Sequence, residues 1–429
     1  MTTRDGEMDE KKRSWTSYSA ITTHRACPQR WNYRYVRDLE KVDPEDVKVE
    51  LEFGLWWHAL RAADSIERGA EKGSLKWIPS KLKTVDGQPP IPLPSLEDVF
   101  AMSEGGYLEL RKLVFDYADQ WWENLASAAK DAWVERLGEG LPVRLRYSDA
   151  RWQERWADDL QHESPLAVEF FWKRELPTLS DPDTGEVKDS ETDLLGYVDE
   201  IYLDERRGIV VVRDHKSSKV LKPASSAEDM MNSQLQVYAW GGSPEVTSWG
   251  HGPIRAVAYD RMRSVHPSVP MLTASGRLAQ RGGQPSVSGT DLVTYLSWAA
   301  GPDGKGVLWG KEDEYYVSGA KKGEPKFGWY QAEDSVIQTL SDPAALSIWH
   351  QRTLTPLNSN IVRTHLRSAV DTAFDINRTK FRVEESREAG RNLGDACRFC
   401  DFAELCRAEM TGGPDGDYDL QMMRLRQKR

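Results

Sequence analysis

The sequence is poor in cysteine and has no long apolar run. Only 4 of its 429 residues are cysteines, which is too few for a disulfide framework in a chain of this size. No stretch approaches the roughly 20 apolar residues of a membrane-spanning helix. The charged N-terminus is not followed by the apolar segment that a secretory signal requires. We therefore expect a cytoplasmic protein, in a reducing compartment, with no membrane partner.

The sequence also lacks internal repeats and the GxxxxGK[ST] phosphate loop, so it encodes no helicase motor. Its 39% hydrophobic residues and 17 Trp provide enough apolar surface for a substantial core, and its 29% charged residues suit a hydrated exterior. The formal net charge of −11 argues against a general coat of positive charge but not against a local basic groove. The net charge is therefore compatible with a nucleic-acid partner.

The order of apolar and turn-forming residues predicts a mixed α/β protein. Apolar periodicity predicts helices over 14–40, 49–68, 97–163 and 359–377, and strands over 166–176 and 254–262. The segments LLGYVDEIYL and GIVVVRDHK predict a β-hairpin. The helix after it is expected to start with Ser226 and Asp229 in capping-box spacing and to end at Gly241 and Gly242.

These elements divide the chain into six parts. They are an N-terminal helical arm with the first cysteine (1–48), a helical region with His58 (49–165), a core (166–260), an insertion of unknown role (261–345), a C-terminal helix with the cysteine cluster (346–412) and a basic tail (413–429).

The predicted hairpin brings two carboxylates and an ammonium group together. If its turn is centred between Arg206 and Arg207, the numbers of paired residues sum to 413, and Asp199 lies opposite Asp214. Lys216 projects on the same face, because strand side chains alternate. A buried pair of like charges needs a divalent metal or a shared proton, and oxygen ligands favour Mg²⁺ or Mn²⁺. A surface lattice of salt bridges is the competing interpretation.

Two further signals are weak on their own. Gln234 and Tyr238 are four residues apart and share one helix face, but such a pair is more often part of a core. His58, in GLWWHAL, is likewise more often a packing residue than a metal ligand.

Taken in order, these motifs resemble the RecB-type branch of the PD-(D/E)XK nuclease superfamily. That branch has Gly-x-x-Asp, then Asp-x-Lys after an apolar strand, then Gln-x-x-x-Tyr on the next helix, and GYVD, DHK and QLQVY match them. The resemblance implies a restriction-endonuclease-like fold, with a central mixed sheet flanked by helices and 166–260 as the nuclease core. It also implies site roles: metal ligation by Asp199, Asp214, His58 and the backbone carbonyl of His215, catalysis by Lys216, and active-site support or DNA contact by Gln234 and Tyr238.

The four cysteines form the second pattern. Cys397, Cys400 and Cys406 have the spacing CxxCxxxxxC, and Cys27 lies 370 positions before the first of them. Four such thiolates hold either zinc or a [4Fe-4S] cluster, and spacing alone does not separate the two. The segments around them resemble the iron–sulfur subgroup of RecB-type nucleases, which includes the AddB nuclease module and the CRISPR-adaptation nucleases. The resemblance implies a [4Fe-4S] cluster that staples the two ends of the chain together.

The N-terminal arm has a basic and aromatic character. Its basic and aromatic residues suit a DNA-binding groove, in which the cations contact phosphates and the rings stack on single-stranded bases. Packing of the two aromatic residues around the cluster explains them equally well. They are Arg25, Arg30, Trp31, Arg34 and Tyr35.

From these patterns we expect a metal-dependent DNA exonuclease that acts on DNA ends in recombination, repair or phage DNA processing. Its origin would be phage or bacterial, and its partner would be a helicase, a recombinase or an annealing protein. The alternative is a non-catalytic or partner-dependent iron–sulfur DNA-binding module in a helicase–nuclease or CRISPR-adaptation complex.

Overall fold

The computed structural model describes most of the chain. Its described residues are 13–41, 48–85, 88–180, 187–222, 225, 229, 232–281, 284–287, 289–310, 324, 327–386, 389–411 and 423–425. Ser226 and, apart from 423–425, the predicted basic tail lie outside the described residues.

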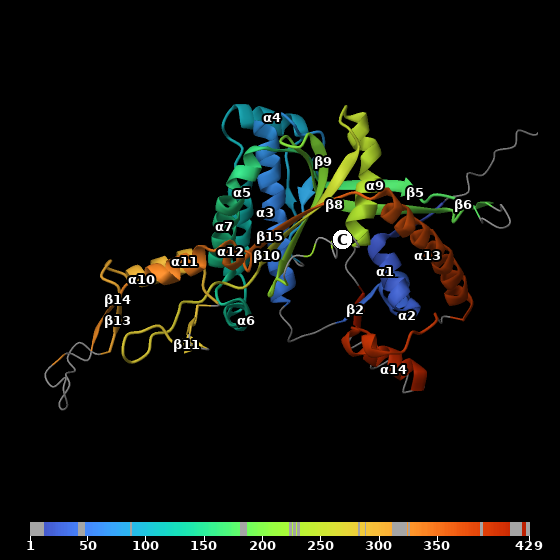
Figure 1. The fold of residues 1–429 in the computed structure, drawn as a ribbon. Coiled ribbons are helices and arrows are strands. Elements are labelled where there is room, and N and C mark those ends of the chain that lie inside the picture. Colours follow the sequence, from blue (N-terminus) through green and yellow to red (C-terminus); the bar gives the residue numbers. More distant parts are fainter. Residues whose placement is uncertain are drawn as a thin grey trace, which may run out of the picture.

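A six-stranded mixed sheet lies at the centre of the molecule (Figure 1). The hairpin strands β8 and β9 are antiparallel, β10 runs parallel to β9, and β15 runs antiparallel to β10. Strand β8 also pairs with β5 and, near its start, with β1. Helices cover both faces of the sheet, which confirms the expected fold class. The strands are β1 (Ser14–Ser17), β5 (Glu163–Glu175), β8 (Thr192–Asp204), β9 (Ile209–Ser218), β10 (Ile254–Arg263) and β15 (His350–Pro356).

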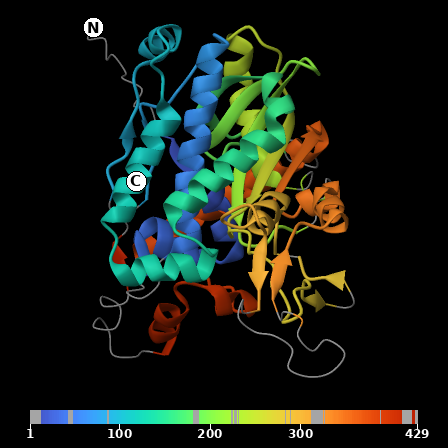
Figure 2. The same cartoon turned by 90° about the vertical axis from the view of Figure 1, so that its left-hand side faces the viewer.

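A tryptophan-rich helical layer covers one face of the sheet (Figure 2). Its core includes Trp56, Trp57, Trp133 and Trp152, each at most 1% exposed. Burial of such large aromatic side chains supplies much of the apolar area that holds a layer of this kind together. The helices, which fall within or extend the predicted ranges 49–68 and 97–163, are α3 (Val49–Glu71), α4 (Leu96–Glu104), α5 (Leu110–Glu123), α6 (Ser127–Leu137) and α7 (Leu141–Gln161).

Three helices cover the opposite face: α1 (Tyr18–Ala26), α9 (Ser233–Ser248) and α13 (Ser359–Ser386). Their apolar side chains form one core with Val210 and Val212 of β9. Val211, between these two, packs in a separate cluster with strands β8 and β10. The alternation follows from the period of two along a strand, and it shows that β9 is covered on both faces, as its apolar run indicates.

The N-terminal segment is not the single helix predicted over 14–40. It begins with strand β1, and helix α1 stops at Cys27, whose backbone is extended (φ −165°, ψ 117°). Pro28 explains the break, because its ring disfavours a helical conformation in the residue before it. After Cys27 come α2 (Pro28–Trp31), a π-helical turn (Asn32–Val36) and strand β2 (Leu39–Lys41).

The predicted end of the helix after the hairpin is also wrong. Helix α9 runs through Gly241 and Gly242 to Ser248, and its N-cap is Asn232, whose side chain accepts from the Gln234 N–H. A Cβ on Gly241 would lie 2.4 Å from the Trp172 ring. This glycine therefore permits close packing of the helix on the sheet and does not terminate the helix.

The segment 261–345 projects beyond the edge of the sheet in Figure 1. It has a small core of its own, which includes Tyr295, Tyr330 and Leu340. Its elements beyond β10 are β11 (Gln280–Arg281), β12 (Gln284–Pro285), α10 (Leu292–Ala300), β13 (Val307–Trp309), β14 (Gly328–Tyr330), α11 (Asp334–Ser341) and α12 (Pro343–Leu346). The remaining short elements of the chain are β3 (Lys81–Leu82), β4 (Ile91–Pro92), β6 (Leu179–Ser180), β7 (Val187–Lys188), a 3-10 turn (Asp395–Phe399), α14 (Ala403–Thr411) and β16 (Met423–Leu425).

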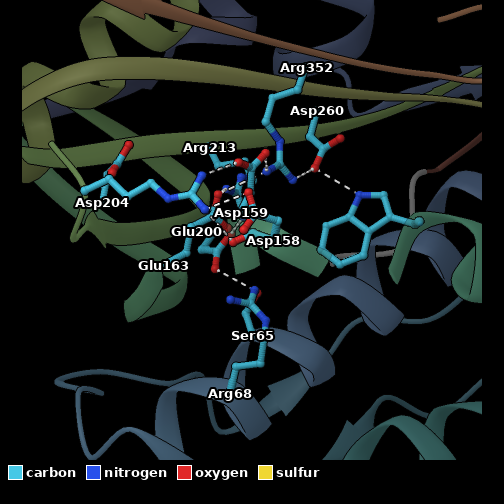
Figure 3. Close-up of polar contacts among 12 residues, drawn as sticks. Ser65, Arg68, Asp158, Asp159, Glu163, Glu200, Asp204, Arg213, Asp260 and Arg352 are labelled. Carbon is cyan, nitrogen blue, oxygen red and sulfur yellow. Dashed lines mark hydrogen bonds and ion pairs between the residues drawn. The ribbon is translucent and has the colours of Figure 1, made fainter. Parts of the chain in front are cut away.

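A buried ion network joins the sheet to the helical layer (Figure 3). The Arg213 guanidinium is fully buried, and its nitrogen atoms lie 2.8 Å from a Glu200 oxygen and 2.5 Å from a Glu163 oxygen. Arg352 bridges Glu163 and Asp260. Because these residues come from β5, β8, β9, β10 and β15, the network ties together five strands of the sheet.

We expect this network to make stability fall in acid. Burial would raise the pKa of Glu163, but Arg213 and Arg352 lower it from 4.5 to about 2. Since the folded pKa is below the unfolded one, the contribution is complete above pH 4.5 and is lost as the pH falls toward 2. It amounts to about 3 kcal/mol. In Glu163→Gln, the loss of melting temperature relative to wild type should therefore be largest near neutral pH and should shrink below pH 4.5.

Melting curves followed by circular dichroism between pH 2.5 and 7 measure this difference. Glu104→Gln, at an exposed position of α4, is the control and should match wild type throughout. A Glu163→Gln deficit that is independent of pH would contradict the assignment.

Candidate active site

The hairpin has the register expected from the sequence. Glu200 pairs with Arg213 and Ile201 with Val212, so Asp199 and Asp214 occupy the next facing positions. One Asp199 oxygen accepts the backbone N–H of His215 at 2.8 Å. The Lys216 ammonium lies 2.8 Å from an Asp214 oxygen. The two carboxylates and the ammonium group therefore converge at the end of the ladder.

Two further side chains complete this cluster. His58 reaches in from α3, with its Nδ1 3.3 Å from an Asp199 oxygen. Glu169 comes from β5, where the flanking pairs Val168–Glu200 and Phe170–Val198 place it opposite Asp199. His58, Glu169 and Asp199 each offer a ligand atom, and these atoms all lie within 4.8 Å of one another. Three strands and one helix thus contribute to a site that has the composition of a metal centre.

The sequence analysis missed Glu169. The available signal was a single carboxylate inside the apolar run LAVEFFW, which has no obvious role in a buried strand. The backbone of Glu169 has a φ of +48°, a conformation that is uncommon for any residue other than glycine. Strain of this kind is concentrated at functional sites, where the surrounding structure holds the residue in place.

The electrostatics of the cluster indicate a deficit of positive charge. Burial and the Asp199 charge raise the pKa of Glu169 to about 7 and that of Asp214 to about 6. Burial would lower the pKa of His58, but Asp199 and Glu169 raise it to about 9. Glu169 and Asp214 therefore hold their protons to a higher pH than isolated carboxylates do, whereas burial would raise the pKa of Asp199 but His58 and Lys216 lower it. A divalent cation would relieve this repulsion.

The two glycines of the sequence motifs are explained by close approach. A Cβ on Gly196 would lie 2.7 Å from the Trp172 ring and 2.9 Å from the Tyr238 ring. A Cβ on Gly54 would lie 3.1 Å from the Ser217 hydroxyl. Gly196 thus lets α9 approach β8, and Gly54 lets α3 cross the end of β9, which brings His58 within reach of Asp199.

Gln234 and Tyr238 lie at the edge of the same site. The Gln234 amide is 3.1 Å from the Tyr238 hydroxyl. Burial raises the pKa of Tyr238, as do the negative charges of Asp214 and Asp199. These two residues therefore lie within electrostatic range of the carboxylates, next to Lys216.

The His215 side chain points away from the cluster, as the sequence analysis expected. It is 3% exposed, and its ring nitrogens lie 3.9 Å from Glu200 and 3.8 Å from Asp260, within the ion network. Burial and the surrounding arginines hold the pKa of His215 well below its ordinary value, so the imidazole is neutral. Metal ligation by its backbone carbonyl stays a prediction.

All four cysteines line one cavity, although Cys27 is far from the others in sequence. The cavity has a volume of about 240 Å³, and Arg30, Tyr33 and Arg391 line it as well. Backbone contacts hold the two ends of the chain together here, since the Gln29 N–H donates to the carbonyl of Gly390. The structure thus places Cys27 beside the three C-terminal cysteines, with which the sequence analysis grouped it.

The basic and aromatic residues of the N-terminal arm do not join the carboxylate cluster. Trp31 is 3% exposed and packs edge-on against His24, and Tyr35 packs against the same core. Neither ring lines the cysteine cavity, so the two aromatic residues do not pack around the cysteines as the alternative expected. Arg25 donates to the Thr372 hydroxyl at 2.8 Å. Arg30 lines the cysteine cavity, and Arg34 is half-buried.

Comparison with known families identifies the relationship. The model of the PD-(D/E)XK nuclease superfamily matches residues 16–407. The chain belongs to this superfamily. Membership implies metal-dependent hydrolysis of phosphodiester bonds, for which these enzymes use Mg²⁺ or Mn²⁺, and it implies DNA binding. No curated protein matches the chain in sequence. None of the described helices combines the length and the apolar character that crossing a membrane requires.

We expect Glu169 to be needed for metal binding. Glu169→Gln keeps the size of the side chain but removes a ligand charge, so the Kd for Mn²⁺ should rise roughly tenfold or more, equivalent to about 1.4 kcal/mol. Isothermal titration calorimetry measures this change. Glu175→Gln, at an exposed position of the same strand, should bind Mn²⁺ like wild type. An unchanged Kd in Glu169→Gln would remove this residue from the ligand set.

Proposed function

We propose that this protein is a metal-dependent DNA exonuclease that hydrolyses phosphodiester bonds at DNA ends. The convergence of His58, Glu169, Asp199, Asp214 and Lys216 supports the proposal more than any other observation. In a purely structural salt-bridge lattice the carboxylate pKa values would be lowered, whereas here burial and the Asp199 charge raise those of Glu169 and Asp214. Such perturbation marks functional sites.

His58, Glu169, Asp199 and Asp214 have the donor chemistry of an Mg²⁺ or Mn²⁺ site, with one imidazole nitrogen and several carboxylate oxygens. When bound, the ion would polarise a phosphoryl oxygen and lower the pKa of a water molecule. The side chain of Lys216 is 47% exposed, so its ammonium group can reach a phosphate or an attacking water. Asp214 holds this ammonium group in place, and Tyr238 and Gln234 border it.

Activity on DNA ends follows from the resemblance of the motifs to the RecB-type branch. The described residues include the complete set of motif side chains, which favours an active enzyme over the non-catalytic binding module. A role in recombination, repair or phage DNA processing, with a helicase, recombinase or annealing protein as partner, belongs to the same proposal.

We further propose that Cys27, Cys397, Cys400 and Cys406 hold a [4Fe-4S] cluster. Within the described residues, His58, Glu169 and Asp199 are the one group of three metal-ligating side chains whose ligand atoms all lie within 4.8 Å of one another. No three cysteine sulfurs therefore lie as close together as that. A tetrahedral zinc ion would hold four sulfurs about 3.8 Å apart. The cavity of about 240 Å³ between them therefore suits a larger group, and its role would be structural.

The catalytic assignment predicts that Asp214→Ala and Lys216→Ala each lower the cleavage rate by about 10²–10³-fold or more, because one removes a metal ligand and the other a group that stabilises charge. The visible spectrum should not change. The assay is the release of nucleotides from end-labelled linear DNA in Mg²⁺ or Mn²⁺, with covalently closed circular DNA of the same sequence beside it.

Cleavage of the circular DNA at the same rate would refute the exonuclease assignment, and unchanged cleavage by Asp214→Ala would refute the site. Weak activity that a helicase or recombinase partner restores would favour the partner-dependent alternative.

The cluster assignment predicts a brown protein that contains iron and acid-labile sulfide in equal amounts after anaerobic purification. Cys400→Ser should lose the broad visible absorption and the iron, and limited proteolysis should then cut first near the joined ends of the chain. Elemental analysis and absorption spectroscopy measure both. A colourless protein with stoichiometric zinc would contradict the iron–sulfur assignment and leave the nuclease assignment untouched.

A further inference from the structure

Two exposed aromatic rings lie next to the carboxylate cluster. Phe171 of β5 pairs with Tyr197 of β8, and their ring centroids are 5.0 Å apart. Phe171 is 40% exposed and Tyr197 is 47% exposed. Phe171 lies two residues from Glu169 along β5, and Tyr197 lies two residues from Asp199 along β8, which corresponds to about 7 Å between Cα atoms in a regular strand. The aromatic pair therefore borders the proposed metal site.

A lysine shows that the rings and the carboxylates share one side of the sheet. The Lys83 ammonium lies over the Tyr197 ring, 4.5 Å from its centroid. Its neighbours Leu82 and Val85 pack in the same hydrophobic core as α3, the helix that brings His58 to Asp199. The flanking residues Leu82 and Val85 are at most 2% exposed, so they anchor the segment that carries Lys83.

This arrangement has the chemistry of a single-strand subsite. A cross-strand aromatic pair stabilises a sheet whether or not it is exposed, but exposure of both rings leaves apolar area in water. Lys83 occupies one face of the Tyr197 ring, which leaves the Phe171 ring to accept a base. The ammonium group remains available to a phosphate, since a surface lysine over an aromatic ring is only weakly held.

We propose that Phe171, Tyr197 and Lys83 form a subsite for the terminal bases of single-stranded DNA. Phe171 stacks a base, Tyr197 supports its ring, and Lys83 contacts the adjoining phosphate. A base within a duplex is already stacked and paired, so a base splayed from a single strand is the form that fits. Every base has a stacking face, and the subsite is therefore tolerant of sequence. The proposal rests on the nuclease function and adds a preference for single-stranded ends.

The test compares full-length wild type with Phe171→Leu, which keeps an apolar side chain but removes the ring. The probe is a single-stranded oligonucleotide with 2-aminopurine at its terminal positions. In buffer without divalent cations, wild type should bind it and quench its fluorescence. Phe171→Leu should bind roughly tenfold more weakly and lose the quenching. Phe381→Leu, at a 61% exposed phenylalanine of α13, is the matched control and should behave as wild type.

Cleavage gives the second readout. In Phe171→Leu the KM for single-stranded DNA should rise about tenfold while kcat stays within roughly twofold. Phe171→Tyr should restore both binding and KM, which a loss of sheet stability would not predict. Cleavage of blunt duplex ends should be equal in wild type and variant. Equal binding and quenching by Phe171→Leu, or an equal loss on duplex DNA, would overturn the proposal.

The two proposals fail in different ways. If the protein cleaves no DNA, the nuclease proposal fails, and the quenching experiment still decides whether the aromatic subsite exists. If Asp214→Ala abolishes cleavage but Phe171→Leu is unaltered in binding and KM, the nuclease proposal stands and the subsite is refuted.

Discussion

The buried guanidinium of Arg213 is the constraint on which the candidate site depends. It lies between Glu163 of β5 and Glu200 of β8, so it fixes β5, β8 and β9 relative to one another. These are the strands that present Glu169, Asp199 and Asp214. A slip of one residue in any of them would leave a buried charge unpaired, which costs several kcal/mol. This cost favours a single register of the three strands, and in that register Glu169, Asp199 and Asp214 lie close together.

Two charge clusters thus share the same strands and differ in their balance. In the ion network, the guanidinium groups of Arg68, Arg213 and Arg352 face three carboxylates, those of Glu163, Glu200 and Asp260. Asp64 and Asp159 contact two of the same guanidinium groups, so each of these three arginines has carboxylate partners. In the site, the carboxylates of Glu169, Asp199 and Asp214 face Lys216, His58 and Lys83, yet the pKa values of Glu169 and Asp214 are raised. The ion network is satisfied by its own ion pairs, whereas a bound cation would stabilise the ionised carboxylates of the site.

Much of this site could be predicted from local sequence, because a hairpin turn determines the partners of its own strands. The facing positions of Asp199 and Asp214 follow from the turn alone. Glu169 could not be found in this way, since its partner depends on a long-range pairing that shifts register between Pro165 and Ala167. Gly241 was misread for a related reason: its role depends on Trp172 of another strand, and only the tertiary contact distinguishes close packing from a helix end.

The ends of the chain are joined by more than the cysteines. The carboxylate of Glu409 lies 2.5 Å from the Tyr33 hydroxyl and 2.5 Å from an Arg37 nitrogen, and it also contacts Arg391. Strand β1 adds to β8 in parallel. Joining the two ends closes a loop of several hundred residues, which has a high entropic cost, although this cost rises only slowly with loop length. The contacts of Glu409 and the pairing of β1 with β8 together offset this cost. A cluster in the cysteine cavity would then lock an arrangement that the polypeptide already favours.

The net charge of −11 shapes how such a protein can meet DNA. Long-range electrostatics oppose the approach of a polyanion, and the carboxylates of the site oppose it most strongly at short range. Binding must therefore draw on local cations, such as the exposed Lys83 over the Tyr197 ring and the exposed Lys216 beside Asp214. A divalent ion reverses the sign of the field at the centre of the site. A bound metal would therefore strengthen DNA binding, and by reciprocity bound DNA would strengthen metal binding.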